Sequence, residues 1–432
     1  NFPERTASSG GLSMARQMKE SGIDWVGEIP NDWVISKLKY LGEYINGYAF
    51  KPDDWQLHGL PIVRIQDLTG SNDNPNYYAG TLDEKYLIKN GDILVSWAAT
   101  LDAFIWNGGD GWLNQHIFKA VPNTKTVNSN YFFWLVREAM KNMNNDNKHG
   151  IFMQHVTLDV FNNFSVPMPP LGEQKQIADY LSQICSEIDI SLTKTKKTIE
   201  DYKKLKQSVI AEAVSKGIRG NRPMKASRIE WIEEIPSTWS ECRIKNAIFP
   251  KDKPIFEDDE IITCFRDGQV TLRKNRREDG FTISFTEQGY HGVDVGDLVI
   301  HGMDAFAGAI GCSDSRGKTT PVVHVCSTIG NNRYFMYYLR SLAYGNILMD
   351  LSNGVRIRSS DFRNFSKLGV FGAIVPPLEE QNEISEYLDK KCSEIDNLIL
   401  KKAALLAELE NYKKSIIYEY VTGKREVPCN AN

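Results

Sequence analysis

The sequence predicts an α+β fold: two mixed α/β domains joined by two long antiparallel coiled-coil helices, related by a pseudo-two-fold internal repeat. Three observations lead to this prediction. The sequence contains two related copies of one module, short β-branched segments alternate with helical ones in each copy, and each copy ends in a long stretch with helical periodicity. Strands and helices have different apolar periods, so the two kinds of segment are distinguishable from the sequence.

The composition is that of an ordinary globular protein. Of its 432 residues, 41% are hydrophobic and 25% are charged, with a net charge of −4, which excludes a protein that coats nucleic acid through bulk positive charge. No apolar stretch approaches the roughly 20 residues of a membrane helix. Seven scattered cysteines indicate reduced thiols in the cytoplasm. Neither cysteines nor histidines show metal-ligand spacing, so we expect no metal site.

The repeat has a long period. The segment that starts at Met18 recurs at Met224, and the Pro-Pro-Leu stretch at Pro169 recurs at Pro376. A period of this length, repeated once, indicates duplication of a whole module and not a solenoid. Between these fixed points the copies barely align, so we expect one scaffold that presents two different surfaces.

Each copy divides into a globular part and a helical tail. Strands are predicted where β-branched residues lie between Gly, Asn or Asp, at residues 59–68, 91–99, 114–122, 282–290, 296–303 and 320–327, and helices are expected from Ser129 and Asn331. The predicted boundaries are 1–17 for a cloning remnant or flexible start, 18–168 and 218–375 for the globular parts, 169–217 and 376–424 for the tails, and 425–432 for a terminal tail.

The tails predict long helices that need a partner. From Glu173 to Lys216 there is no Pro or Gly, and apolar residues recur every three or four positions. A lone helix of about 40 residues is not stable with such a stripe exposed. We therefore expect the tails to pair, with Leu205 opposite Tyr412; a structural stalk or a dimerising coiled coil is the alternative. The predicted pairing residues are Ile177, Leu181, Ile188, Leu192, Ile199, Ile384, Leu388, Ile395, Ile399 and Leu406.

Motifs that recur in both copies carry a resemblance to a known family. Each module opens with Trp, Ile-Pro and Trp at fixed spacing, and each tail starts with Pro-Pro-Leu-x-Glu-Gln-x-x-Ile-x-x-Tyr-Leu. The sequence resembles the specificity subunit of a type I restriction–modification enzyme over nearly all of residues 18–424. The residues that carry the resemblance are Trp25, Ile29, Pro30, Trp33, Trp231, Ile235, Pro236, Trp239 and the stretches 169–181 and 376–388.

The resemblance implies a division of labour. Each globular part would be a target recognition domain that reads one half of a bipartite asymmetric site on double-stranded DNA. The helices would fix the gap between the halves and dock two methyltransferase subunits. In that family the assembly methylates adenine at N6 with S-adenosylmethionine held by the methyltransferase subunits, and a motor subunit, where present, cleaves DNA with ATP and Mg²⁺. This chain would be a non-catalytic recognition subunit that binds no cofactor itself.

The chemistry-bearing motifs agree with a non-catalytic role. The stretch from Gly311 to Thr319 resembles a phosphate-binding loop but has five residues between its glycines instead of four. Asp53, followed by Asp83 and Lys85, faintly resembles the carboxylate–lysine set of a nuclease, and the second copy lacks it. A single-chain site-specific nuclease therefore remains an alternative, as does a bivalent DNA-binding regulator that acts without a methyltransferase.

DNA contacts are expected from loops of the globular parts. Arginine presents a bidentate fork to guanine edges and phosphates, and glutamine or asparagine pairs with adenine edges. The opening tryptophans are candidates for base stacking, but their repetition in both copies favours scaffold packing. The predicted DNA-binding residues are Arg64, Gln66, Asn114, Gln115, Gln154 and His155 in the first part, and Arg266, Arg273, Lys274, Arg276, Arg277, Arg316, Lys318, Thr319, Arg356 and Arg358 in the second.

Overall fold

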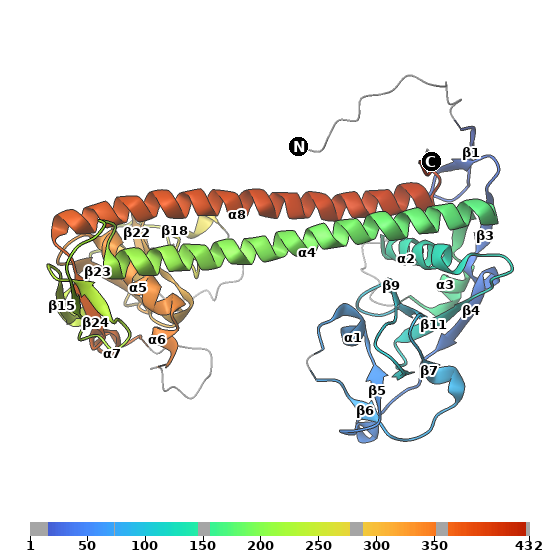
Figure 1. The fold of residues 1–432 in the computed structure, drawn as a ribbon, viewed down its shortest axis with the longest axis horizontal. Helices are drawn as coiled ribbons and strands as arrows, with labels where there is room; N and C mark the ends of the chain where they lie inside the picture. Colours follow the sequence, from blue (N-terminus) through green and yellow to red (C-terminus); the bar gives the residue numbers. More distant parts are fainter. Residues whose placement is uncertain (1–15, 73, 146–155, 277–287, 351–361, 429–432) are drawn as a thin grey trace. The chain divides into compact units, whose positions relative to one another are not determined.

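The fold consists of two compact units that share two long helices. One unit comprises residues Asn1–Lys194 and Leu406–Asn432, and the other comprises Thr195–Leu405. Each unit therefore holds one globular part, the start of one long helix and the end of the other (Figure 1). The computed structural model describes residues 16–72, 74–145, 156–276, 288–350 and 362–428.

Unit 1 is a mixed α/β part followed by a long helix. In chain order it contains β1 (Met18–Glu20), β2 (Glu28–Pro30), β3 (Val34–Lys37), η1 (Leu38–Tyr40), β4 (Gly42–Asn46), η2 (Pro52–Asp54), β5 (Leu60–Val63), α1 (Ile65–Thr69), β6 (Tyr77–Tyr78), η3 (Glu84–Tyr86), β7 (Leu87–Ile88), β8 (Ile93–Ser96), β9 (Asp102–Ile105), β10 (Gly111–Leu113), β11 (Ile117–Pro122), α2 (Ser129–Asn145), α3 (Leu158–Asn163), β12 (Ser165–Met168) and the first half of α4 (Leu171–Lys216).

Unit 2 begins within α4 and ends within the last helix. It contains β13 (Met224–Ala226), β14 (Glu234–Pro236), β15 (Ser240–Arg243), η4 (Ile244–Asn246), β16 (Ile248–Pro250), β17 (Ile262–Cys264), β18 (Val270–Leu272), η5 (Arg273–Asn275), β19 (His291–Val293), β20 (Leu298–His301), η6 (Ala305–Ala307), β21 (Ile310–Cys312), β22 (Gly317–Thr319), β23 (Val323–Thr328), α5 (Asn332–Tyr344), α6 (Ile347–Asp350), α7 (Phe365–Gly369), β24 (Gly372–Val375) and the first part of α8 (Leu378–Val421).

A four-stranded antiparallel sheet forms the framework of each unit. Its strand order is β4-β11-β8-β9 in unit 1 and β16-β23-β20-β21 in unit 2. A helix packs on the sheet in each case. Tyr131 and Phe132 of α2 share a core with Phe118, and Tyr334 and Phe335 of α5 pack in the core of unit 2. These elements confirm several predictions. The predicted strands 91–99, 114–122, 296–303 and 320–327 correspond to β8, β11, β20 and β23, and the helices predicted from Ser129 and Asn331 are α2 and α5.

The remaining strands differ between the units. Unit 1 has a second sheet of order β6-β5-β10-β7, in which β5 and β10 run parallel, whereas unit 2 has the hairpin β17-β18 and the pair β19-β22. These strands come from stretches in which the two copies barely align. The units thus share a framework and carry different additions on it.

A glutamate ties the start of each long helix to the opening of its module. Glu173 accepts a hydrogen bond from Trp33 Nε1 at 2.9 Å, and Glu380 accepts one from Trp239 Nε1 at 3.0 Å. Trp33 and Trp239 are 0% and 1% exposed, so the preference for scaffold packing over base stacking is confirmed for these two. The arginines that pair with the two glutamates are Arg16 and Arg222, each at 2.5 Å.

The glutamine next to each glutamate fastens the helix start to the globular part. Gln174 accepts a hydrogen bond from the backbone N–H of Asn128 at 2.8 Å, and Gln381 accepts one from Asn331 at 2.9 Å. Each amide also donates to the carbonyl of the proline that opens the motif, at 2.9 and 2.8 Å. The recurrent glutamine is therefore a structural joint: it binds the N–H of the residue before α2 or α5 and the carbonyl of the first of the two prolines before the long helix.

The end of each long helix packs beside the start of the other. In unit 1, Lys413 of α8 pairs with Asp189 of α4 at 2.6 Å. In unit 2, Lys206 of α4 pairs with Asp396 of α8, also at 2.6 Å. Buried tyrosines of the globular parts reach the helix ends, since the hydroxyls of Tyr131 and Tyr334 donate to the carbonyls of Val421 (3.4 Å) and Val214 (3.3 Å).

Burial of the apolar stripe is strongest near the helix ends. Predicted pairing residues Ile177, Leu181, Ile188, Leu192, Ile384, Leu388 and Ile395 are buried, whereas Ile199, Ile399 and Leu406 are half-buried. Leu205 and Tyr412, which the prediction also placed on the stripe, are 48% and 49% exposed. Near the ends, α2 and α5 help to cover the stripe.

Two other expectations need correction, and a third cannot be compared with the structure. The predicted strand 59–68 is a strand only at β5, because Asp67 accepts the backbone N–H of Arg64 at 2.8 Å and starts the short helix α1. Residues 16 and 17 belong to the fold, since Arg16 pairs with Glu173 and the Gln17 carbonyl accepts the N–H of Asn31 at 3.0 Å. Most of the strand predicted at 282–290 lies outside the described residues. No described helix combines the length and apolarity needed to cross a membrane.

The joint at the start of α8 yields a stability prediction. Replacement Glu380→Ala leaves the Arg222 guanidinium and Trp239 Nε1 without their carboxylate, in a site where the glutamate side chain is 8% exposed. We expect a loss of about 3 kcal/mol in the free energy of unfolding, because one partner of a buried ion pair is removed. Urea unfolding followed by tryptophan fluorescence measures it.

The matched control is the neighbouring residue on the same helix turn. Glu379 is 81% exposed at its side chain, so Glu379→Ala should change stability by less than about 0.5 kcal/mol. Equal losses for the two variants would contradict the assignment of the joint to Glu380.

Candidate nucleic-acid interface

Four of the predicted DNA-binding residues of unit 1 meet at one edge of its second sheet. Strands β5 and β10 run parallel with Val63 opposite Leu113, so Arg64 and Asn114 both follow the carboxyl ends of adjacent strands. The backbone N–H of Asn114 bonds to the carbonyl of Val63 at 3.3 Å. Gln66 lies two residues beyond Arg64, in the first turn of α1, and Gln115 follows Asn114.

These four side chains differ in how accessible they are. Gln66 is exposed and Gln115 is half-exposed, whereas Asn114 is 8% exposed, which favours a framework role for that amide. The exposed residue His116 follows Gln115, and its Nε2 lies 3.4 Å from the Gln115 amide nitrogen. The centroids of the His116 and Trp97 rings are 5.4 Å apart. His116 was not predicted, and the signal that would have found it is its place directly after Gln115.

Two predicted contacts of unit 1 cannot be placed. Gln154 and His155 lie outside the described residues. Val156, which follows them, donates its N–H to the carbonyl of Trp97 at 3.0 Å.

An aromatic residue that the sequence analysis missed also lies at this edge. The guanidinium of Arg64 lies over the ring of Trp55, with Cζ 4.4 Å from the ring centroid. Trp55 remains 46% exposed. The contact between Trp55 and Arg64 joins the loop between β4 and β5 to the end of β5, and it forms because this loop turns back toward the sheet.

The predicted cations of unit 2 gather on the hairpin β17-β18 and the residues after it. Arg266 lies in the hairpin turn, and Arg273 and Lys274 lie in η5. Three of these cations already have carboxylate partners. The pairs are Arg266–Asp304 at 2.9 Å, Arg276–Asp267 at 2.8 Å and Lys274–Glu260 at 2.5 Å. The arginine-rich surface is therefore partly neutralised by its own chain.

Beside this hairpin lies an open groove of about 780 Å³, lined in part by Arg266, Arg273 and Arg276. The guanidinium of Arg276 lies 4.2 Å from the ring centroid of Phe265. Burial lowers the pKa of His301, which also lines the groove, although the nearby carboxylate of Asp304 opposes that shift. The groove thus combines a stacked guanidinium with a half-buried imidazole.

A buried arginine holds the hairpin turn in place. Arg340 of α5 is 7% exposed and donates from Nη2 to the carbonyl of Asp267 at 2.7 Å. Gly268 in the turn has φ of 87°, and a Cβ there would lie 2.4 Å from Arg340 Nη1. Only glycine fits this position, because both the backbone and the close approach exclude a side chain.

Two other predicted contacts of unit 2 are held inside the structure. Arg316 donates to both carboxylate oxygens of Asp259 at 3.0 Å, to Asp294 and to the carbonyl of Pro254 at 2.9 Å. Thr319 is 1% exposed, which favours a framework role for its side chain. Lys318 lies half-exposed in β22. Arg277, Arg356 and Arg358 lie outside the described residues.

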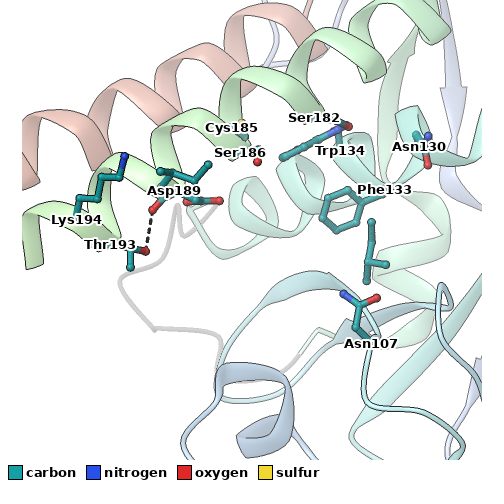
Figure 2. A pocket seen from close by; sticks show the side chains of 12 residues that line it. Asn107, Asn130, Phe133, Trp134, Ser182, Cys185, Ser186, Asp189, Thr193 and Lys194 are labelled. Carbon is teal, nitrogen blue, oxygen red and sulfur yellow. Dashed lines mark hydrogen bonds between the residues drawn. The ribbon is translucent and has the colours of Figure 1, made fainter. Parts of the chain in front are cut away.

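Unit 1 also has an apolar groove, between α2, β9 and α4. Figure 2 shows it lined by side chains that include Phe133 and Trp134 of α2 and Ser186 and Asp189 of α4, and its volume is about 880 Å³. Thr193 donates its hydroxyl to the carbonyl of Asp189 at 2.9 Å. None of these residues belongs to the predicted interface.

Comparison with known proteins finds similarity to type I specificity subunits. The model of the type I restriction modification DNA specificity domain matches residues 30–201. The chain is 25% identical over 425 residues to the type I restriction enzyme MjaVIII specificity subunit of Methanocaldococcus jannaschii, covering 92% of this chain and 94% of that subunit. The chain is thus similar to a type I specificity subunit over nearly its whole length.

Two further similarities have different extents. The EcoBI specificity subunit of Escherichia coli is 25% identical over 242 residues, which cover 55% of this chain and about half (51%) of that subunit. A solved structure from work on the assembly and conformational transition of the type I R-M system has a TM-score of 0.66 at 16% identity, covering 92% of this chain and 99% of that one. At that identity the solved structure supports the fold alone.

The two near-miss motifs lie in settings that differ from those of the enzyme sites they resemble. The stretch Gly311–Thr319 runs from β21 to β22, strand to strand, whereas a phosphate-binding loop leads into a helix. Asp83 pairs with Lys85 at 3.3 Å on an exposed turn. Within the described ranges, no three His, Cys, Asp or Glu side chains come together to hold a metal ion.

The contacts of Arg316 predict a structural role with a pH signature. Hydrogen bonds from Arg316 hold the pKa of Asp259 below its ordinary value of 3.8. A carboxyl with a lowered pKa stabilises the fold above its unfolded value and loses that contribution as the pH falls through the folded value. We expect Arg316→Met to lower the free energy of unfolding by about 1–3 kcal/mol at pH 7. When the pH falls below about 4, the free energy of unfolding of this variant should drop by less than that of the unaltered protein.

Denaturant unfolding at pH 7, 4 and 2.5 measures both effects. Arg228 is exposed, and Arg228→Met serves as the control that keeps the full pH dependence. An Arg316 variant with unchanged stability and unchanged acid sensitivity would show that the guanidinium is free to serve another role.

Proposed function

We propose that this chain is the DNA sequence-recognition and scaffold subunit of a type I restriction–modification system. The observation that carries the proposal is that two matched frameworks bear different sheets, and that the accessible predicted DNA-binding residues lie on those different parts. Residues 18–168 and 218–375 act as target recognition domains, 169–217 and 376–424 as spacers, and 425–432 as a terminal tail. Each domain reads one half of a bipartite site on double-stranded DNA in the cytoplasm.

Recognition uses different chemistry in the two domains. In the first, Arg64, Gln66 and Gln115 face the DNA, with Asn114 supporting them from within the sheet. In the second, the cations on and after hairpin β17-β18, together with Lys318, make the contacts. Gln154, His155, Arg277, Arg356 and Arg358 remain predicted contacts outside the described residues. Arginine and glutamine suit base edges, and arginine and lysine also suit phosphates.

The two long helices set the gap between the half-sites. Support comes from each unit by itself, since the start of one helix is bonded there to the end of the other, as antiparallel pairing requires. An antiparallel coiled-coil pair with a module at each end gives a pseudo-two-fold arrangement. The same rods dock two methyltransferase subunits, and large apolar side chains left exposed on them, such as Ile190, Leu398 and Leu400, suit that role.

The chain supplies recognition, and its partners supply the chemistry. S-adenosylmethionine belongs to the methyltransferase subunits, and ATP and Mg²⁺ belong to a motor subunit where one is present. The ion pairs of Arg266, Lys274 and Arg276 mean that DNA phosphates must displace carboxylates of this chain. We therefore expect weak DNA binding by the isolated chain, because the net gain from each phosphate contact is reduced.

Titration of duplex DNA at two salt concentrations tests the proposal. The chain with its methyltransferase subunit should bind a duplex that contains the recognised sequence at least tenfold more tightly than a scrambled duplex. The chain alone should show a much smaller difference in affinity between the two duplexes. Sequence-specific binding that is equal with and without the methyltransferase would favour the bivalent regulator. Mg²⁺-dependent cleavage by the purified chain, lost in Asp53→Ala, would favour the nuclease.

The role of the helices is tested by lengthening both of them. Insertion of four helix-forming residues after Lys196 and after Ala403 adds about one turn, or roughly 6 Å, to each helix. We expect the gap between half-sites to grow by about two base pairs, at 3.4 Å per base pair, while both half-site sequences stay the same. Mapping of methylated adenines across a host genome reads the gap directly.

Insertion into one helix alone is the control for this experiment. It puts the two apolar stripes out of register, so we expect a lower free energy of unfolding and no uniform change in the gap between the half-sites. A changed half-site sequence after the double insertion would contradict the assignment of the helices as spacers.

A further inference from the structure

We propose that Arg64 reads a guanine in the first half-site and that Trp55 is the positioning residue that prepares it. The inference rests on the proposed function and names the chemistry of one contact within it. It starts from the scarcity of arginine in the first domain, where Arg64 and Arg137 are the two arginines of residues 18–168.

The two arginines have different surroundings. Arg137 is bound to the carboxylate of Asp102, at 3.0 Å from Nε and 3.3 Å from Nη2. The guanidinium of Arg64 forms no ion pair within the described part of the chain and lies instead over the ring of Trp55. The nearby carboxylate of Asp67 is occupied by the backbone N–H of Arg64 at 2.8 Å and by the amide of Asn72 at 2.6 Å.

Both partners of the stack are held from the backbone side. Arg64 directly follows Val63, which is fully buried in β5. Next to Trp55, Gln56 exchanges backbone hydrogen bonds with Tyr77 at 2.9 and 3.3 Å, and its side chain accepts the N–H of Ala79 at 3.1 Å. The exposed tryptophan is therefore fixed in position by the residue that follows it.

The loop closes only because it contains a glycine. Gly59 has φ of 104°, and a Cβ there would lie 2.4 Å from the carbonyl oxygen of Tyr78. Such a constraint keeps the loop against the sheet, so that the indole ring lies beside the end of β5. The rigid loop and the rigid strand together fix the plane in which the guanidinium lies.

A guanidinium stacked on an indole ring keeps its edge N–H groups available. Stacking engages the face of the fork, whereas hydrogen bonding uses its edge, so the two are compatible. Guanine offers N7 and O6 on its major-groove edge, and a bidentate arginine matches that pair of acceptors. Prior ordering of the side chain lowers the conformational cost of binding. The exposed amide of Gln66, two residues on, suits an adjacent base.

A phosphate contact is the competing use of the same side chain, and the two make different predictions. A lost phosphate contact weakens binding to all sequences alike, whereas a lost base contact relaxes one position of the site. The experiment uses the complex of the full chain with its methyltransferase subunits. Methylated adenines are mapped for the unaltered protein and for the variants Arg64→Ala, Arg64→Lys, Trp55→Ala and Trp55→Phe.

We expect Arg64→Ala to relax one G·C pair of one half-site by about tenfold to hundredfold. Arg64→Lys should not restore it, because lysine lacks the bidentate fork. Trp55→Ala should relax the same position to a smaller degree, and Trp55→Phe should recover most of the discrimination. The other half-site and the gap stay unchanged, and Arg266→Ala, which alters the other domain, provides the matched control.

A chemical substitution in the DNA isolates the contact. Replacement of that guanine by 7-deazaguanine, which lacks N7, should weaken binding of the unaltered complex and have little effect on the Arg64→Ala complex. Uniform weakening at all sequences, or an unchanged half-site in Arg64→Ala with normal thermal stability, would overturn the inference. The proposed function fails separately, if the unaltered complex shows no sequence-specific methylation.

Discussion

The fold depends on the burial of two apolar stripes that neither long helix can cover alone. Each stripe is buried where three elements meet: the start of one helix, the end of the other and a helix of the globular part. In unit 1 this site includes Leu181, Tyr420 and Phe132, and in unit 2 it includes Leu388, Ile210 and Phe335. Because a helix end and a helix start are required at each site, neither globular part completes its core with its own tail only.

The polar joints follow from the same constraint. Gln174 and Gln381, in the first turns of the long helices, bind the backbone N–H of Asn128 and of Asn331 and so connect these turns to the globular parts. Glu173 and Glu380 then fasten the opening tryptophans to the same turns. Because these contacts hold the scaffold, the sequences of the strands between them can differ between the two units. This explains how one scaffold carries two different surfaces.

The sequence predicted the parts of the structure that depend on period and repetition. The long helices, the central framework strands β8, β11, β20 and β23, and the burial of Trp33 and Trp239 all follow from patterns in the sequence. Contacts that depend on tertiary folding were missed. The stack of Arg64 on Trp55 needs the turn of a loop, and the carboxylates around Arg316 come from residues 57 and 22 positions away. An arginine-rich stretch does not reveal which guanidinium is already bound.

Exchange of the variable part of one module tests the central claim most directly. Residues 34–122 and 240–328 both run from the strand after the opening tryptophan to the end of the framework strand that comes last in the chain, β11 or β23. In a chain where a second copy of residues 240–328 replaces residues 34–122, both globular parts carry the same recognition surface, and the two long helices are unchanged. Mapping of methylated adenines should then show the second half-site twice, as an inverted repeat with an unchanged gap. Retention of the first half-site sequence, or a changed gap, would contradict the account.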